Sequence, residues 1–143
     1  MIPELIKQWD ENKYKLEDYF RNTPQDEYMD YEIIVRKIFE LCITKYNSYT
    51  DRGFNLEKMT VINDGGYSGC EIYIIPANVY YPQATDYVVT NTYYGSCSGC
   101  DTLLGISEYK SGIPNEEQVK EYMTVALHLV QKLKWLFEEE EDY

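Results

Sequence analysis

The fold is decided by one run of residues, Tyr87-Val88-Val89-Thr90-Asn91-Thr92-Tyr93. The run is rich in β-branched and aromatic side chains, which favour strands over helices. Two shorter runs of similar composition, 58–62 and 71–75, precede it in the chain. Turn signals separate the three runs, at Asn63-Asp64-Gly65-Gly66 and between Pro76 and Pro82. The pattern predicts an antiparallel sheet of three or four strands.

Helical patterns flank this sheet on both sides in the sequence. Apolar residues at helical spacing predict one helix from Pro3 to about Asn22 and a second over about 27–46. A third helix begins at Pro114-Asn115, where Asn115 and Gln118 can form a capping box, and its apolar face extends to Phe137. The order helix, helix, sheet, helix predicts a single α+β domain over 1–137 with an acidic tail at 138–143.

Length and composition limit the class of protein. The chain has 143 residues, of which 44% are apolar, so it can bury the core of one ordinary domain. No apolar run approaches the roughly 20 residues that a membrane span requires. The first residues form neither a basic start nor an apolar core, so we expect no secretory signal and a cytoplasmic protein with reduced cysteines.

Charge and tyrosine are unevenly distributed. The net charge is −12, and five of the negative charges lie in 138–142. Between Met59 and Tyr109 there is no Lys or Arg, but there are five acidic residues and eight of the 16 tyrosines. Direct nucleic-acid binding relies on clustered Lys and Arg, so a basic partner protein is favoured instead.

A surface of this composition suits a basic partner. Tyr offers a rigid amphipathic contact that stacks on Arg, and carboxylates accept its guanidinium fork. The alternative is that several of these tyrosines face the core of the sheet at period two. The candidate partner-binding residues are Asp64, Glu71, Tyr80, Tyr81, Asp86, Tyr93 and Tyr94.

A Gly/Ser loop after the last strand carries two of the four cysteines. Cys97 and Cys100 have the two-residue spacing that lets both sulfur atoms bind one zinc ion. Cys70, in a similar Ser-Gly-Cys-acid string, is a candidate third ligand. A fourth ligand would have to be Asp101 or Glu71. No other cofactor is expected.

Two further residues are weak candidates for chemistry. Cys42 lies on the apolar stripe of the second helix and is expected in the core, and His128 is expected on an exposed helix face. A short helix opened by Asp101 would favour a reactive thiolate in the preceding loop, but the acidic neighbours oppose it. Since the sequence contains no nucleophile, metalloprotease or phosphate-loop motif, we expect a non-enzymatic protein.

The loop also carries a resemblance. The string Tyr94-Gly95-Ser96-Cys97-Ser98-Gly99-Cys100-Asp101-Thr102-Leu103 resembles a loop that follows a β-strand in small uncharacterised acidic proteins of tailed bacteriophages. The resemblance covers about ten of the 143 residues and transfers no site residue. It implies a protein of the infected bacterial cytoplasm, where phage proteins of this size often bind and block host enzymes, including defence nucleases.

These observations lead to one hypothesis and two alternatives. The hypothesis is a phage-type, non-enzymatic binding module whose acidic, tyrosine-rich surface occupies the basic, nucleic-acid-binding site of a host protein. The first alternative is a small zinc- or thiol-containing protein centred on Cys70, Cys97 and Cys100. The second is a minor virion or assembly protein.

Overall fold

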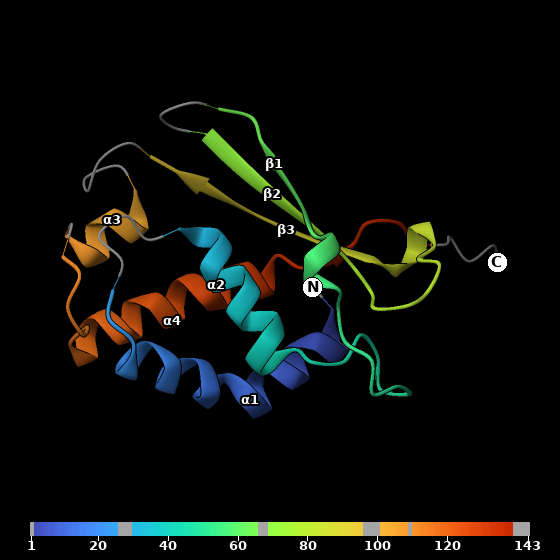
Figure 1. Ribbon diagram of the computed structural model, residues 1–143, viewed down its shortest axis with the longest axis horizontal. Coiled ribbons are helices and arrows are strands. Elements are labelled where there is room, and N and C mark those ends of the chain that lie inside the picture. The colour runs from blue at the N-terminus through green and yellow to red at the C-terminus, as the bar shows by residue number, and fades with distance from the viewer. Residues whose placement is uncertain (1, 26–29, 66–68, 96–100, 109, 139–143) are drawn as a thin grey trace.

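The computed structural model describes residues 2–25, 30–65, 69–95, 101–108 and 110–138. In chain order its elements are α1 (Pro3–Asn22), α2 (Tyr31–Lys37), the π-helical turn η1 (Ile38–Cys42), the 3-10 turn η2 (Leu56–Lys58), β1 (Thr60–Asn63), β2 (Gly69–Pro76), the 3-10 turn η3 (Ala84–Asp86), β3 (Tyr87–Tyr94), α3 (Thr102–Ser107), α4 (Glu116–Gln131) and β4 (Lys134–Trp135). The predicted α+β fold is confirmed. Helices α1, α2 and α4 lie on one side of the sheet, and no helix of the described residues covers the other side, which we call the open side (Figure 1).

The sheet is antiparallel throughout, with strand order β1-β2-β3-β4. Tyr73 pairs with Thr90 and Ile75 with Val88 across the two central strands, and these four side chains are buried. Since cross-strand partners share a face, these residues define the side that packs on the helices. The alternate residues of β2, such as Ile72 and Ile74, lie on the open side and are half-buried.

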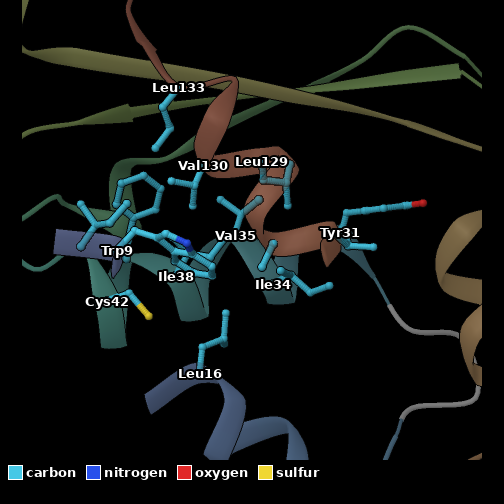
Figure 2. Close-up of a cluster of buried hydrophobic side chains, with 14 of the residues drawn as sticks. Trp9, Leu16, Tyr31, Ile34, Val35, Ile38, Cys42, Leu129, Val130 and Leu133 are labelled. Carbon is cyan, nitrogen blue, oxygen red and sulfur yellow. The ribbon is translucent and has the colours of Figure 1, made fainter. Parts of the chain in front are cut away.

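The core lies between the helices and this face of the sheet. Trp9 and Leu16 of α1 are almost fully buried among side chains of α2, η1 and α4 (Figure 2). These positions are the apolar stripes predicted for the helices, so helical periodicity located the core correctly. The predicted burial of Cys42 is also confirmed, and burial raises the pKa of its thiol to about 11.

The second helix is shorter than predicted. The α-helix begins at Tyr31, after the N-cap residue Asp30, whose side chain accepts a hydrogen bond from Glu32 N at 3.0 Å. Helical structure ends at Cys42 in a π-helical turn rather than continuing to 46. The predicted stretch 27–29 before this helix lies outside the described residues.

The C-terminal helix ends earlier than its apolar pattern predicted. Helix α4 ends at Gln131, and Lys134 and Trp135 form β4 beside β3. Leu136 N then donates to Tyr87 O at 2.8 Å, and the ring of Trp135 lies 6.5 Å from that of Phe54. Phe137 is therefore 54% exposed, since strand pairing replaces the last helical turn. No Gly or Pro in the sequence marks this change.

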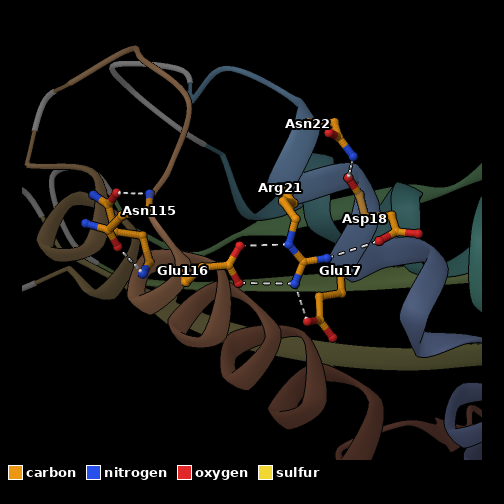
Figure 3. Close-up of polar contacts among 7 residues, drawn as sticks. Glu17, Asp18, Arg21, Asn22, Asn115 and Glu116 are labelled. Atoms are coloured by element: carbon orange, nitrogen blue, oxygen red, sulfur yellow. Dashed lines mark hydrogen bonds and ion pairs between the residues drawn. The ribbon is translucent and has the colours of Figure 1, made fainter.

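The start of α4 matches its prediction and is tied to α1. Asn115 and Gln118 form the predicted capping box, with Gln118 N donating to Asn115 Oδ1 at 2.8 Å. Glu116 accepts from Arg21 Nε at 2.8 Å, and the same guanidinium contacts Glu17 (Figure 3). These acids raise the pKa of Arg21, and the pKa of Glu116 is lowered by its bond to Arg21.

Among the described residues, no helix is both long enough and apolar enough to cross a membrane.

Candidate functional site

The main candidate site is a recess at the end of the sheet where β1 and β2 meet. It has a volume of about 250 Å³ and is formed by β2, the end of β3, and the starts of α2 and α3. None of the described residues that line it is basic. We call it the anionic recess; it is lined by Asp30, Tyr31, Glu71, Tyr94, Gly95, Asp101 and Leu104.

Asp101 holds three parts of the recess together. It is the N-cap of α3, and its Oδ1 accepts a hydrogen bond from Leu104 N at 3.2 Å. Its Oδ2 accepts from Gly95 N at 2.8 Å, at the end of β3. The hydroxyl of Tyr31 donates to Oδ1 at 3.3 Å, and the tyrosine itself lies at the edge of the core with this hydroxyl directed outward (Figure 2). Asp101 as a whole is 7% exposed, and its carboxylate links α2, β3 and α3.

The surroundings of the Tyr31 hydroxyl change its pKa. Burial, followed by the negative charge of Asp101, raises the pKa of Tyr31 to about 12. The phenol is therefore a neutral hydrogen-bond donor to the carboxylate over the ordinary pH range.

Glu71 lies on the helix-facing side of β2, at the end of the sheet. The hydroxyl of Tyr73 donates a short hydrogen bond to Glu71 Oε2. Burial is the largest cause that raises the pKa of Tyr73, followed by the bond to Glu71 and the charges of Glu71, Asp30 and Glu32. Three carboxylates therefore act on one phenol, which indicates that negative charge is concentrated at this end of the sheet.

A polar cluster at the β1–β2 turn borders the recess. Tyr94 donates from its hydroxyl to Asn63 Oδ1 at 2.6 Å, and Asn63 Nδ2 donates to Glu71 Oε1 at 3.4 Å. Asp64 folds back so that its Oδ1 accepts from Cys70 N at 2.7 Å. Gly69 is needed here, because a Cβ at this position would lie 2.8 Å from Gly65 Cα and 2.9 Å from Asp64 Oδ1.

The structure divides the predicted partner-binding residues between the two ends of the sheet. Glu71 and Tyr94 line the anionic recess. Asp64 lies at the same end in the exposed β1–β2 turn. Tyr93 also lies there, 73% exposed, but it pairs with Cys70 and so faces the open side of the sheet.

The remaining three residues lie at the opposite end. Tyr80 and Tyr81 are 87% and 75% exposed in the connection between β2 and β3, with ring centroids 4.6 Å apart. Asp86 ends η3, and its carboxylate accepts from Gln83 N at 2.8 Å. Five steps along β2 separate Glu71 from Pro76, which is about 17 Å at roughly 3.4 Å per residue. The seven residues therefore form two surfaces rather than one.

The predicted metal site falls largely outside the described residues, since these include Cys70 but not Cys97 or Cys100. Cys70 is half-buried on the open side of β2, where Asn91 Nδ2 lies 3.7 Å from its sulfur atom. Within the described ranges, no group of three His, Cys, Asp or Glu residues is arranged to hold a metal ion. His128 is exposed, as predicted. The short helix that Asp101 could open in the sequence is present as α3.

Two residues that bring a carboxylate and a hydroxyl to the recess, Asp30 and Tyr31, were not identified as site residues from the sequence. Asp30 and Tyr31 were placed inside a helix predicted to begin near residue 27. An Asp directly before an apolar stripe, followed by an acid in the first turn, is a helix-start signal that could have identified Asp30 as a cap. The contact between Tyr31 and Asp101 spans 70 residues, and no local pattern predicts it.

The fold and the recess together define a small acidic α+β domain with carboxylates and tyrosine hydroxyls gathered at one end of its sheet. No protein-family model, curated protein or solved structure matches the chain.

Proposed function

We propose that the protein is a non-enzymatic, phage-type binding module that occupies a basic, nucleic-acid-binding site on a host protein. One observation carries the proposal: the carboxylates of Asp30, Glu71 and Asp101 surround a recess whose described lining contains no basic residue. Like charges gathered in this way favour an approaching cation. The proposal places a host enzyme, such as a defence nuclease, in the role of partner.

Arginine is the side chain that suits the recess best. Its guanidinium donates through a planar fork to carboxylates and stacks on aromatic rings. Glu71 and Asp30 supply acceptor oxygens, and Tyr94 supplies a ring at the rim. In this arrangement the carboxylates of the module take the place of nucleic-acid phosphates, and the host protein loses access to its normal ligand.

The exposed pair Tyr80 and Tyr81 serves as a second contact in this proposal. Tyrosine is common among the residues that dominate binding energy at interfaces. The pair lies at the other end of the sheet from Glu71, and a standard interface of about 800 Å² per partner is wide enough to include both ends.

The test is an affinity capture of the tagged protein from bacterial lysate, washed with increasing salt and then with a polyanion such as heparin. We expect a nucleic-acid-binding partner that both washes release. A double variant, Asp30→Asn with Glu71→Gln, keeps the acceptor oxygens but removes two charges, and should retain much less partner. Its matched control, Asp10→Asn with Glu11→Gln, removes two charges from the exposed side of α1. Equal capture by both double variants would contradict the proposal.

The zinc- or thiol-containing alternative has one supporting observation. A hydrogen bond from Gly95 N to Asp101 Oδ2 joins the two described residues on either side of 96–100, the stretch of sequence that contains Cys97 and Cys100. A structural zinc ion predicts that a chelator lowers the melting temperature of the parent protein and that Cys97→Ser has the same effect. Identical melting with and without chelator, in a preparation free of zinc by elemental analysis, would eliminate it.

A further inference from the structure

Strand β1 lies at the edge of the sheet (Figure 1). It pairs with β2 on one side, and no other described strand pairs with it. All four of its residues are exposed, including Val61 at 36% and Ile62 at 46%. Edge strands are usually protected from pairing with other chains by charged residues, proline or bulges. The four residues of β1, Thr-Val-Ile-Asn, include no charged residue and no proline.

The hydrogen-bonding pattern shows which backbone groups point outward. Asp64 N donates to Cys70 O at 3.1 Å, so the backbone N–H of Asp64 points toward β2, while Cys70 N donates to the side chain of Asp64. Backbone groups alternate in direction along an antiparallel ladder, which directs the backbone of Thr60 and Ile62 toward β2. The N–H and C=O groups of Val61 and Asn63 therefore point away from the sheet, where another strand could pair with them.

We propose that β1 pairs antiparallel with β1 of a second copy of this chain, about a two-fold axis at Val61. The two four-stranded sheets become one continuous sheet of two copies. The proposal concerns a surface separate from the anionic recess and does not depend on the proposed partner.

Charge complementarity selects this register. Lys58, at the end of the turn η2, precedes β1, and Asp64 follows it. When Val61 lies opposite Val61 of the second copy, these flanking residues meet at the two ends of the paired strands, with Lys58 of each copy near Asp64 of the other. Ile62 then lies beside Thr60 on the open side of the sheet. Two other registers keep the same backbone groups paired. Sliding one β1 strand by two residues along the other places Asp64 opposite Thr60 in one direction and Lys58 opposite Ile62 in the other. Only the Val61-centred register pairs the opposite charges that flank this uncharged strand.

Salt separates self-pairing from partner binding. Each copy has a net charge of −12, so two copies repel at low ionic strength. Salt screens this repulsion, and association of two copies should become tighter as salt is raised. Binding of a basic partner at the recess should weaken under the same change. The two interactions therefore respond to salt in opposite directions.

The test is sedimentation equilibrium of the full chain over a range of concentrations, at low and high salt. We expect the average mass to rise from 16.9 kDa toward twice that value, at lower concentration in high salt. The Val61→Lys variant places two ammonium groups at the axis and should weaken the dimer at least tenfold. The control Tyr49→Lys adds the same charge at a residue that is 96% exposed, and should dimerise at least as well as the parent.

A second pair of variants tests the register. Lys58→Glu sets like charges opposite each other at both ends of the paired strands and should weaken the dimer. Adding Asp64→Asn, which keeps the acceptor for Cys70 N, should recover part of the loss. A parent that stays monomeric at all concentrations and salts, or a Val61→Lys variant that dimerises like Tyr49→Lys, would overturn the proposal. Loss of association in Lys58→Glu without recovery in the double variant would overturn the register.

Discussion

The two ends of the sheet have similar composition but different structure. At the β1–β2 end, Glu71 and Tyr94 lie in a recess where carboxylates and hydroxyls bond to one another. At the other end, Tyr80 and Tyr81 stand in solvent, and the carboxylate of Asp86 caps a short 3-10 turn. The difference comes from what packs against each end. The starts of α2 and α3 enclose the first, whereas the second is a connection between strands. Tyrosine and acid content alone therefore does not define a binding surface.

The largest expected difference between the ends is in stability. Tyr73 is fully buried beneath the recess, and Tyr80 is 87% exposed. Replacing a buried aromatic residue by Ala removes contacts and leaves a cavity, so Tyr73→Ala should lower the free energy of unfolding by about 3–5 kcal/mol. Tyr80→Ala should change it by less than about 0.5 kcal/mol. Denaturant unfolding of the two variants measures both values. Similar losses would mean that the connection at 77–86 is packed more tightly than its exposure indicates.

Alkaline pH should destabilise the recess end through its buried phenols. The pKa of Tyr31 is about 12 in the folded protein and 10 in the unfolded chain, so the unfolded chain loses its proton first as pH rises. The stabilisation is complete below pH 10 and is lost between about 10 and 12, at about 1.4 kcal/mol for each unit of pKa difference. Burial of Cys42 adds a similar loss between about 9 and 11.

Substitution separates these two contributions. Tyr31→Phe should make the fall in stability above pH 10 shallower by the contribution of one phenol, and should leave in place the falls from Cys42 and from Tyr73 and Tyr122, whose pKa values burial also raises. The measurement is the free energy of unfolding in urea at a series of pH values. An unchanged slope in Tyr31→Phe would place the alkaline sensitivity elsewhere.

Removing the capping carboxylate at each end should also lower stability by different amounts, and this difference is smaller than the one between Tyr73→Ala and Tyr80→Ala. Asp101 accepts from Leu104 N, Gly95 N and the hydroxyl of Tyr31 while almost fully buried. Removing it leaves buried donors without a partner, so Asp101→Ala should cost about 1–3 kcal/mol. Asp86 caps a turn in contact with solvent, and Asp86→Ala should cost less than about 1 kcal/mol. Thermal melting of both variants tests the order, and a larger loss for Asp86→Ala would reverse it.

The sequence predicted the fold better than it predicted the site. Local patterns in the sequence identified α1, the capping box at Asn115 and the three main strands. Each of these features depends on residues that are close in sequence. The switch from helix to β4 after Gln131 was missed, since its cause is the free edge of β3 rather than any local breaker. The recess was half predicted. Glu71 was identified because it lies in a stretch of sequence rich in acidic residues and tyrosine. Its neighbours in the recess, Asp30 and Asp101, lie 41 and 30 residues away along the chain.

The smallest expected effect is on peptide affinity, and it compares the two ends directly as binding surfaces. Glu71→Gln and Asp86→Asn each remove one negative charge, so both change the net charge of the molecule equally. A short polyarginine peptide should bind the first variant about two- to fivefold more weakly than the parent, which corresponds to about 0.5–1 kcal/mol. The second variant should differ little, because a charge about 17 Å away along the strands lies beyond the screening length of roughly 8 Å at physiological salt. Fluorescence anisotropy at that salt measures both affinities. At much lower salt the screening length exceeds the separation, and the two variants should then converge. Equal weakening at physiological salt would mean that net charge, rather than the recess, attracts the peptide.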